Sequence, residues 1–325
     1  MNAAVLRWVG APLRLEDRPA PQPRGEEVLV RVRGAGVCHS DLHMVDGLIP
    51  GLPLPRVLGH EIAGEADGLG PVLVYASWGD GICRWCQRGE EQLCARVAEP
   101  GWARDGGFAE AVLVPSRRYL LPLGDLDPVR AAPLADAGVT AYRAVRRVQP
   151  WLADGGTAVV LGAGGLGQFA VQFLRLASDA RNAGGAWVVA VDPDPAKRDQ
   201  ASRLGADGTA AGGDDLEPGA AVAVLDLVGS DATLAEAARL VRPTGVVMVV
   251  GEVGGRLPFG FGAIPHEAHL TTSVWGSRRE LATVVELARA GTLRWDVETL
   301  PLDRVNEGLE RLRHGRVRGR LVLTP

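Results

Sequence analysis

Three cysteines lie close together in the stretch CRWCQRGEEQLC, as Cys83, Cys86 and Cys94. Sulfur donors at such short intervals are typical of a structural zinc site, which takes four ligands in a tetrahedron. The chain has four cysteines in all, and the fourth, Cys38, lies far upstream. The cluster therefore lacks a fourth ligand of its own kind, and Cys38 requires a separate explanation.

A second group of metal-binding residue types surrounds Cys38, in GVCHSDLHMVDG, and His60, in GHEIAG. Thiolate sulfur and imidazole nitrogen are both good zinc ligands. A lone buried cysteine or a packed histidine is the simpler interpretation. The polar and ionisable neighbours of Cys38 favour a chemical site instead; they are His39, Ser40, Asp41 and His43.

The segment VVLGAGGLG has the glycine pattern of a dinucleotide-binding loop, between an apolar run typical of a strand and the expected helix QFAVQFLRLA. Gly162 makes the tight turn, Gly164 lets the backbone approach a pyrophosphate, and Gly167 permits close helix–strand packing. Gly165 and Leu166 belong to the same loop. The phosphates are expected on the free N–H groups at the helix N-terminus.

Asp192 ends the next expected strand, at the distance typical of the carboxylate that binds the adenosine ribose. Its charge would repel a 2′-phosphate, which predicts NAD rather than NADP. A turn residue at a strand end is the alternative role for Asp192. Asp194 and Pro195 are typical of a helix N-cap followed by proline at the first helical position. Lys197 could reach the ribose or remain solvated.

Two textures divide the chain. Residues 1 to about 137 are rich in proline and glycine with short β-branched runs, which predicts an irregular, mostly antiparallel β domain. From about Gly138, apolar strands alternate with glycine turns and amphipathic helices, which predicts an α/β domain with a parallel sheet covered on both faces. The tail contains one expected helix and a closing strand that returns to the first domain.

Composition excludes several classes of protein. A net charge of −4 gives no field for binding nucleic acid. The basic run RHGRVRGR near the C-terminus is expected to decorate the terminal helix and strand. No apolar stretch reaches the ~20 residues that span a bilayer, so no membrane partner is expected. The N-terminus lacks the features of a secretory signal, and the few cysteines favour a reducing compartment, so a cytoplasmic location is expected.

Together these motifs resemble the zinc-dependent medium-chain alcohol dehydrogenase family. The resemblance runs through GVCHSDLH, GHEIAGE, the cysteine-rich segment, APLADAGVTAYRAV, VVLGAGGLG and VRGRLVLTP, and so covers nearly the whole chain. These motifs are similar to those of the bacterial secondary-alcohol dehydrogenases that accept a broad range of substrates. The family implies a GroES-like, mostly β catalytic domain over residues 1–137, completed by 280–325, and a doubly wound NAD-binding Rossmann domain over 138–279.

The resemblance implies a catalytic zinc held by Cys38, His60 and a third ligand. That ligand is commonly a cysteine in the family, and the corresponding position here is Asp136. Thiolate and carboxylate carry the same charge, and their zinc bonds of ~2.3 Å and ~2.0–2.2 Å differ by a shift that a loop can absorb. Asp136 could instead cap the helix AGVTAYRAVRRV that follows it.

The same resemblance answers the question of the cysteine cluster. By the family's spacing, the first ligand of its structural zinc lobe corresponds to Asp80. Asp80, Cys83, Cys86 and Cys94 would then form a closed, non-catalytic site. The alternative is a lobe that has lost its metal and keeps three free thiols.

The resemblance also implies roles for neighbouring residues. Ser40 accepts the proton of the alcohol and passes it, through the nicotinamide ribose, toward His43 near solvent. Asp41 hydrogen-bonds His60 and fixes its tautomer, and Glu61 is an alternative ligand during water exchange. The remaining residues expected at the cofactor are His39, Val228, Val250 and Arg279.

The implied function is hydride transfer between an alcohol, in the first place a secondary one, or its ketone or aldehyde, and NAD(H). Polyol and sugar dehydrogenases share these motifs and remain an alternative. A zinc-free quinone- or enoyl-reductase-like enzyme is a further alternative, against which the set Cys38, His60 and Asp136 argues. The expected partners are the small-molecule substrate and further copies of the chain in a homodimer or homotetramer.

Overall fold

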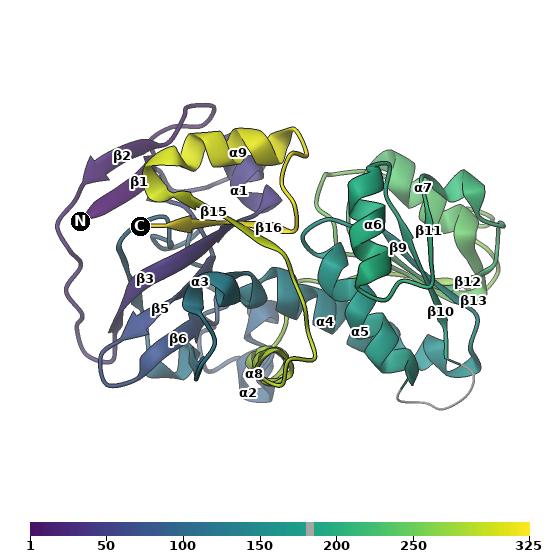
Figure 1. The fold of residues 1–325 in the computed structure, drawn as a ribbon, viewed down its shortest axis with the longest axis horizontal. Helices are drawn as coiled ribbons and strands as arrows, with labels where there is room; N and C mark the ends of the chain where they lie inside the picture. The colour runs from purple at the N-terminus through teal and green to yellow at the C-terminus, as the bar shows by residue number, and fades with distance from the viewer. Residues whose placement is uncertain (180–184) are drawn as a thin grey trace. The chain divides into compact units, whose positions relative to one another are not determined.

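The computed structural model describes residues 1–179 and 185–325. The chain divides into two units. The first consists of Met1–Val139, Gly276–Thr292 and Asp296–Pro325, and the second of Thr140–Trp275 and Leu293–Trp295. Both chain termini therefore belong to the first unit, where they lie at the ends of strands (Figure 1).

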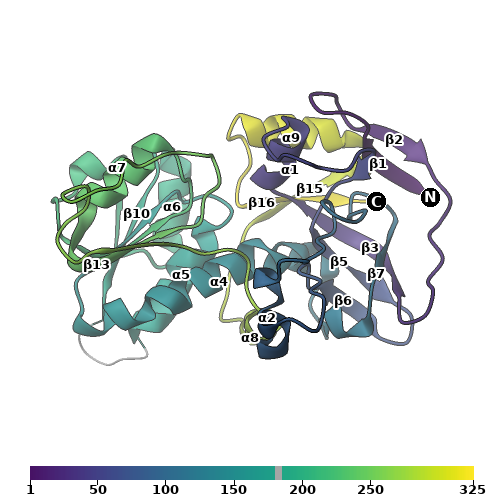
Figure 2. The same cartoon turned by 180° about the vertical axis from the view of Figure 1, so that it is seen from behind.

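Two sheets build the first unit. The smaller has the order β2-β1-β4, made of β1 (Asn2–Leu6), β2 (Arg14–Asp17) and β4 (Arg56–Val57). The larger follows the path β15-β16-β3-β5-β6-β8, with β7 paired to β3 (Figure 2). Its strands are β3 (Val28–Val37), β5 (Glu61–Ala66), β6 (Gly70–Val74), β7 (Ala111–Val114), β8 (Leu120–Pro122), β15 (Val297–Pro301) and β16 (Arg320–Thr324).

The helices of the first unit are short, and several begin at a recognisable cap. Asp127 accepts from the Val129 N–H at the start of α3, and Ser277 and Glu280 form a capping box at the start of α8. The α-helices are α1 (His39–Val45), α2 (Arg84–Arg88), α3 (Pro128–Ala131), α8 (Arg278–Arg289) and α9 (Val305–Arg313). The 3-10 turns are η1 (Glu91–Leu93), η2 (Arg117–Tyr119), η3 (Ala132–Ala135) and η6 (Leu302–Arg304).

The C-terminal strand β16 lies between β15 and β3 in the larger sheet and is antiparallel to β3. Leu321 is opposite Val37 in this pairing. Because antiparallel register continues residue by residue, Arg320 lies opposite Cys38. The end of the chain therefore reaches the residue that follows β3.

The second unit contains one parallel sheet of six strands, in the order β11-β10-β9-β12-β13-β14. This is the doubly wound order, in which the strands extend outward in one direction from β9 and then in the opposite direction from β12. The strands are β9 (Thr157–Leu161), β10 (Trp187–Val191), β11 (Gly208–Ala210), β12 (Ala221–Asp226), β13 (Val241–Val249) and β14 (His269–Thr272). The predicted α/β class, a mostly β part and a parallel-sheet part, is confirmed.

Helices cover the sheet of the second unit and explain its apolar strands. α5 and α6 pack against β9, β10 and β11, and α7 packs against β12 and β13. β12 is buried along its whole length. The elements besides the strands are α4 (Ala137–Val148), which begins in the first unit, η4 (Gln149–Asp154), α5 (Gly167–Asp179), α6 (Pro195–Arg203), η5 (Gly213–Asp215) and α7 (Asp231–Leu240). Among the described residues, no helix is long and apolar enough to cross a membrane.

Two glycines of the loop after β9 have different packing surroundings. A side chain at Gly167 would contact the carbonyl oxygen of Gly162, whose own φ is 94°. A side chain at Gly164 would find no atom within 4 Å. Close packing at the start of α5 therefore requires Gly167, whereas the space beside Gly164 is open.

This difference predicts that the same substitution destabilises the chain at Gly167 and has little effect at Gly164. Gly167→Ala should lower the free energy of unfolding by about 1–3 kcal/mol, because the added methyl group forces the backbone apart. The matched variant Gly164→Ala should stay within about 0.5 kcal/mol of the original chain. Thermal and denaturant unfolding measure both values, and equal stability of the two variants would contradict the packing.

Candidate functional site

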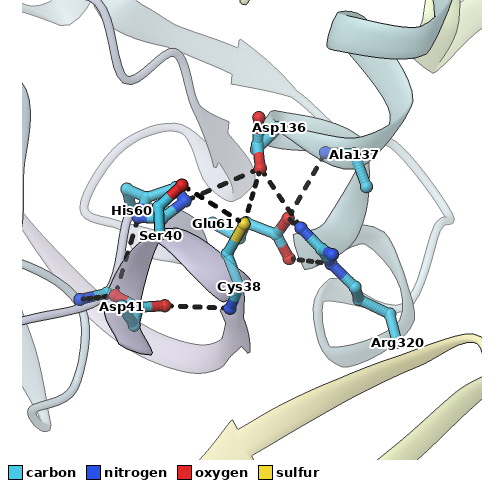
Figure 3. A network of polar contacts seen from close by, with 9 residues as sticks. Cys38, Ser40, Asp41, His60, Glu61, Asp136, Ala137 and Arg320 are labelled. Carbon is cyan, nitrogen blue, oxygen red and sulfur yellow. Dashed lines mark hydrogen bonds and ion pairs between the residues drawn. The ribbon is translucent and has the colours of Figure 1, made fainter. Parts of the chain in front are cut away.

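Three segments that are far apart in the sequence bring Cys38, His60 and Asp136 together in the first unit (Figure 3). Cys38 caps α1 directly after β3, His60 precedes β5, and Asp136 ends η3 just before α4. All three side chains are buried. Cys38 Sγ lies 3.4 Å from Asp136 Oδ2, and His60 Nε2 lies 3.6 Å from the same oxygen.

These separations fit a tetrahedral zinc ion. Bonds of ~2.0–2.3 Å at tetrahedral angles put neighbouring ligand atoms about 3.3–3.8 Å apart. The three donor atoms all lie within 4.8 Å of one another. Sulfur, imidazole nitrogen and carboxylate oxygen are also the donors that zinc takes in proteins. Three ligands would leave one position open, which is typical of a catalytic rather than a structural site.

Asp41 supports both ends of this cluster. One of its oxygens accepts a hydrogen bond from the Cys38 N–H at 2.9 Å, and the other from the Gly59 N–H at 3.2 Å. Its carboxylate lies 3.7 Å from His60 Nδ1, which is longer than a hydrogen bond. Burial raises the pKa of Asp41, against the lowering effect of His60. Asp41 therefore holds the backbone on which two donors are mounted and faces the far nitrogen of the imidazole.

The groups around His60 are mostly acidic. Burial lowers the pKa of the imidazole, but Asp41, Asp136 and Cys38 outweigh burial and hold that pKa well above its ordinary value. The negative charge that favours protonation of His60 also favours a bound cation. The cluster is therefore electrostatically suited to bind a metal ion.

Glu61 and Arg320 form a buried ion pair beside the donors. Arg320 Nε lies 3.0 and 3.1 Å from the two oxygens of Glu61, and Nη2 contacts both Glu61 Oε1 and, at 3.2 Å, Asp136 Oδ2. The Ala137 N–H, at the start of α4, donates to Glu61 Oε1 at 3.3 Å. Burial raises the pKa of Glu61 to about 7, against the lowering effect of Arg320. The carboxylate of Glu61 therefore points at Arg320 in this structure.

The sequence analysis did not single out Arg320. The basic run that contains it was expected to decorate the surface of the terminal helix and strand. That expectation is wrong for Arg320, which is only 3% exposed. An arginine directly before the apolar run LVL of the closing strand was the available signal.

Trp102 is a second neighbour of the cluster that the sequence did not indicate. Its ring centroid lies 5.5 Å from that of His60, at an interplanar angle of 45°. The loop that carries Trp102 is attached to the backbone before His60, because the Gly107 N–H donates to Gly59 O and the Phe108 N–H to Leu58 O. Trp102 therefore packs beside His60 from a loop that is hydrogen-bonded to the segment preceding His60.

The predicted proton-transfer residues both lie on α1. Ser40 Oγ is 3.7 Å from Cys38 Sγ, and Ser40 is half-buried. His43 is also half-buried, and burial lowers its pKa against a smaller raising effect of Asp46. A lowered pKa keeps the imidazole neutral at pH 7, which is the form that accepts a proton. His39 opens α1 and is exposed.

The second cluster is the predicted lobe, with Asp80, Cys83, Cys86 and Cys94 also within 4.8 Å of one another. Cys83 Sγ lies 3.6 Å from Cys86 Sγ, across the first turn of α2. One oxygen of Asp80 accepts from the N–H groups of Cys83 and Ile82, and these bonds lower its pKa. Burial raises the pKa of the bare Cys86 thiol to about 12. Four side chains of metal-binding types therefore lie close together in the lobe.

The glycine loop of the second unit lies at the point where the strand order reverses. Asp192 follows β10 directly and accepts from the Ala163 N–H, inside the loop, at 2.9 Å. Its other oxygen accepts from the Asp194 N–H at 3.0 Å. The predicted N-cap role of Asp194 is confirmed, because its side chain accepts from the Ala196 N–H. Asp192 therefore holds the turn that Gly162 begins.

The other residues expected at the cofactor lie as follows. Val228 and Val250 come just after the carboxyl ends of β12 and β13, and Val228 packs against Gly162. Gly165 and Leu166 lead into α5, and Lys197 is a half-buried residue of the first turn of α6. Arg279 is the second residue of α8, in the first unit. Their contacts with a cofactor stay predictions.

Comparisons with known proteins agree with this arrangement. Residues 24–125 match the family described as alcohol dehydrogenase GroES-like domain, and residues 165–290 match that described as zinc-binding dehydrogenase. The chain is 36% identical to a D-arabinose 1-dehydrogenase (NADP(+)) of Saccharolobus solfataricus, over 100% of this chain and 97% of the relative. It is 37% identical to an NAD-dependent alcohol dehydrogenase of Sulfurisphaera tokodaii, over 100% of both chains.

Solved structures give the same result. The alcohol dehydrogenase of Aeropyrum pernix superposes with a TM-score of 0.91 at 36% identity, and the match covers 100% of each chain. The homo-oligomer and the cytoplasmic location stay predictions. The predicted GroES-like and Rossmann parts and the predicted enzyme class, an alcohol dehydrogenase, are confirmed: the chain belongs to the zinc-dependent medium-chain alcohol dehydrogenase family.

Proposed function

We propose that this chain oxidises an alcohol, in the first place a secondary one, with NAD⁺, or reduces the matching ketone or aldehyde with NADH, at a zinc ion held by Cys38, His60 and Asp136. The observation that carries the proposal is the convergence of three buried donor atoms at separations of 3.4 and 3.6 Å. When bound, zinc supplies a Lewis acid that makes a neighbouring hydroxyl more acidic and polarises a carbonyl.

The chain's own residues handle the proton of the reaction. Oxidation removes a hydride and a proton from the alcohol, and the hydride goes to NAD⁺. Ser40 accepts the proton at its hydroxyl oxygen and releases its own hydroxyl proton, which moves on to an imidazole nitrogen of His43. The half-buried position of both residues on α1 and the lowered pKa of His43 support this order. Asp41 orients the donors by accepting from the backbone of Cys38 and Gly59.

Sugar and polyol oxidation is the second candidate function. A relative with 36% identity is named a D-arabinose 1-dehydrogenase (NADP(+)), and a solved structure with a TM-score of 0.85 is named a D-arabinose dehydrogenase. The motifs are the same for both substrate classes. Initial rates for simple secondary alcohols and for aldoses and polyols of matched size, all with NAD⁺, separate the two functions.

The metal-site proposal predicts the effect of removing its carboxylate. Asp136→Ala should remove one metal ion per chain and lower alcohol-dependent NADH formation by more than about 100-fold, since the Lewis acid is worth several kcal/mol. Elemental analysis and the NADH absorbance assay measure the two effects. The matched change Asp303→Ala, at an exposed aspartate of the same unit, should alter neither. Full metal content and activity in Asp136→Ala would refute the assignment.

The relatives include both NAD- and NADP-dependent enzymes, so they do not decide the cofactor of this chain. The preference for NAD that we propose therefore rests on Asp192. NADH should bind at least about tenfold more tightly than NADPH, since a carboxylate close to a 2′-phosphate repels it by more than 1 kcal/mol. Asp192→Asn keeps an acceptor oxygen but removes the charge, so it should narrow this preference. Fluorescence titration with both cofactors measures it, with Asp199→Asn, an exposed residue of α6, as control. Equal affinities of the original chain for NADH and NADPH would overturn the proposal.

We propose further that the lobe holds a structural zinc ion through Asp80, Cys83, Cys86 and Cys94. Cys86→Ser should then lower the metal content by one ion per chain and reduce the thermal unfolding temperature, because structural zinc contributes directly to folding. The chain that remains folded should keep its turnover rate. Metal analysis, calorimetry and the NADH assay test these points. An unchanged metal content would mean that the lobe binds no metal.

A further inference from the structure

A buried arginine joins two carboxylates at the metal-site candidate. Arg320 comes from β16, and the pairing of β16 with β3 puts it opposite Cys38. Its guanidinium contacts Glu61 through Nε and Nη2 and Asp136 through Nη2, and it is 3% exposed. The C-terminal strand is therefore in direct contact with a side chain that we assign as a metal ligand.

The contact is to one oxygen of Asp136 in particular. Oδ2 lies 3.2 Å from Arg320 Nη2, 3.4 Å from Cys38 Sγ and 3.6 Å from His60 Nε2 (Figure 3). A carboxylate oxygen has lone pairs for two partners, so Oδ2 can accept from an arginine and still ligate a cation. The hydrogen bond thus holds the same atom that faces the other two donors.

A carboxylate needs this support more than a thiolate does. A cysteine ligand presents one sulfur atom, whereas an aspartate presents two oxygens and turns broadly about its terminal bond. An aspartate that turns away, or binds through both oxygens, changes the geometry of the site. A planar guanidinium that also pairs with Glu61 is a rigid support against such turning.

We propose that Arg320 is a positioning residue that makes an aspartate a competent ligand at position 136, by fixing Oδ2 toward Cys38 and His60. The inference rests on the proposed function only in requiring that a metal ion binds there. It makes a specific statement about coupling: the effect of Arg320 on metal binding depends on which residue stands at position 136.

A double-mutant cycle tests this coupling. The affinity for Zn²⁺ is measured by competition with a chromophoric chelator, and the site is followed by the absorption spectrum of Co²⁺, under reducing conditions. Arg320→Met should weaken the affinity about 10–100-fold and alter the Co²⁺ spectrum, as loss of a residue that orients a metal ligand usually does. In the Asp136→Cys background, Arg320→Met should change the affinity little. Arg320→Lys should retain part of the affinity, because lysine keeps the positive charge but lacks the planar, forked N–H donors of the guanidinium group.

Two controls separate positioning from stability. Arg320→Met leaves Glu61 buried without its cation, so the pair Glu61→Gln/Arg320→Met is measured as well, and it should show the same loss of affinity. Arg311→Met removes an arginine that pairs with Glu298 elsewhere in the first unit and should leave the affinity unchanged. Thermal unfolding of every variant reports whether it folds.

The outcomes are distinct. An equal loss in the Asp136 and the Asp136→Cys backgrounds, or full recovery of affinity in Glu61→Gln/Arg320→Met, would overturn the positioning role. If instead Asp136→Ala and the original chain hold the same amount of metal, the proposed function itself fails, whatever Arg320 does.

Discussion

The ion pair of Arg320 with Glu61 and Asp136 offsets the main electrostatic problem of the first unit, which is the repulsion between buried acidic groups. Cys38, Asp41, Glu61 and Asp136 are acidic groups buried close to one point, and like charges repel strongly away from water. Arg320 balances part of that charge. A divalent cation between the three donors, as proposed, would balance more. The unit therefore has an electrostatic reason to bring in its C-terminal strand and to bind a metal ion.

The two aspartates assigned as ligands have a feature in common. By the family resemblance, each stands where a cysteine is common. Each also accepts a hydrogen bond from an arginine at a carboxylate oxygen: Asp136 from Arg320, and Asp80 from Arg96 at 2.9 Å. The energetic weight of the two contacts differs, because the Arg320 side chain is 4% exposed and that of Arg96 is 68% exposed. An exposed pair contributes little, whereas a buried pair constrains its partners strongly.

The second unit uses a carboxylate for another purpose. Asp192 links two backbone segments, since it accepts hydrogen bonds from the N–H groups of Ala163, inside the glycine loop, and of Asp194, at the start of α6. A ribose bound there would meet a carboxylate that the fold already holds in place, which is the condition for selective recognition. The same side chain thus serves the loop's structure and, as proposed, the choice of cofactor.

The sequence by itself determined the features that depend on residues close to one another along the chain. The glycine loop with its strand and helix, the lobe cysteines and the alternation of strands and helices are local patterns, because turns, helices and parallel strands impose their own spacing. The ligand set Cys38, His60 and Asp136 came from resemblance to a family rather than from spacing. Only the tertiary structure decided the position of Arg320 and of Trp102. Arg320 reaches Asp136 because β16 pairs with β3 across most of the chain's length, and no local pattern records such a pairing.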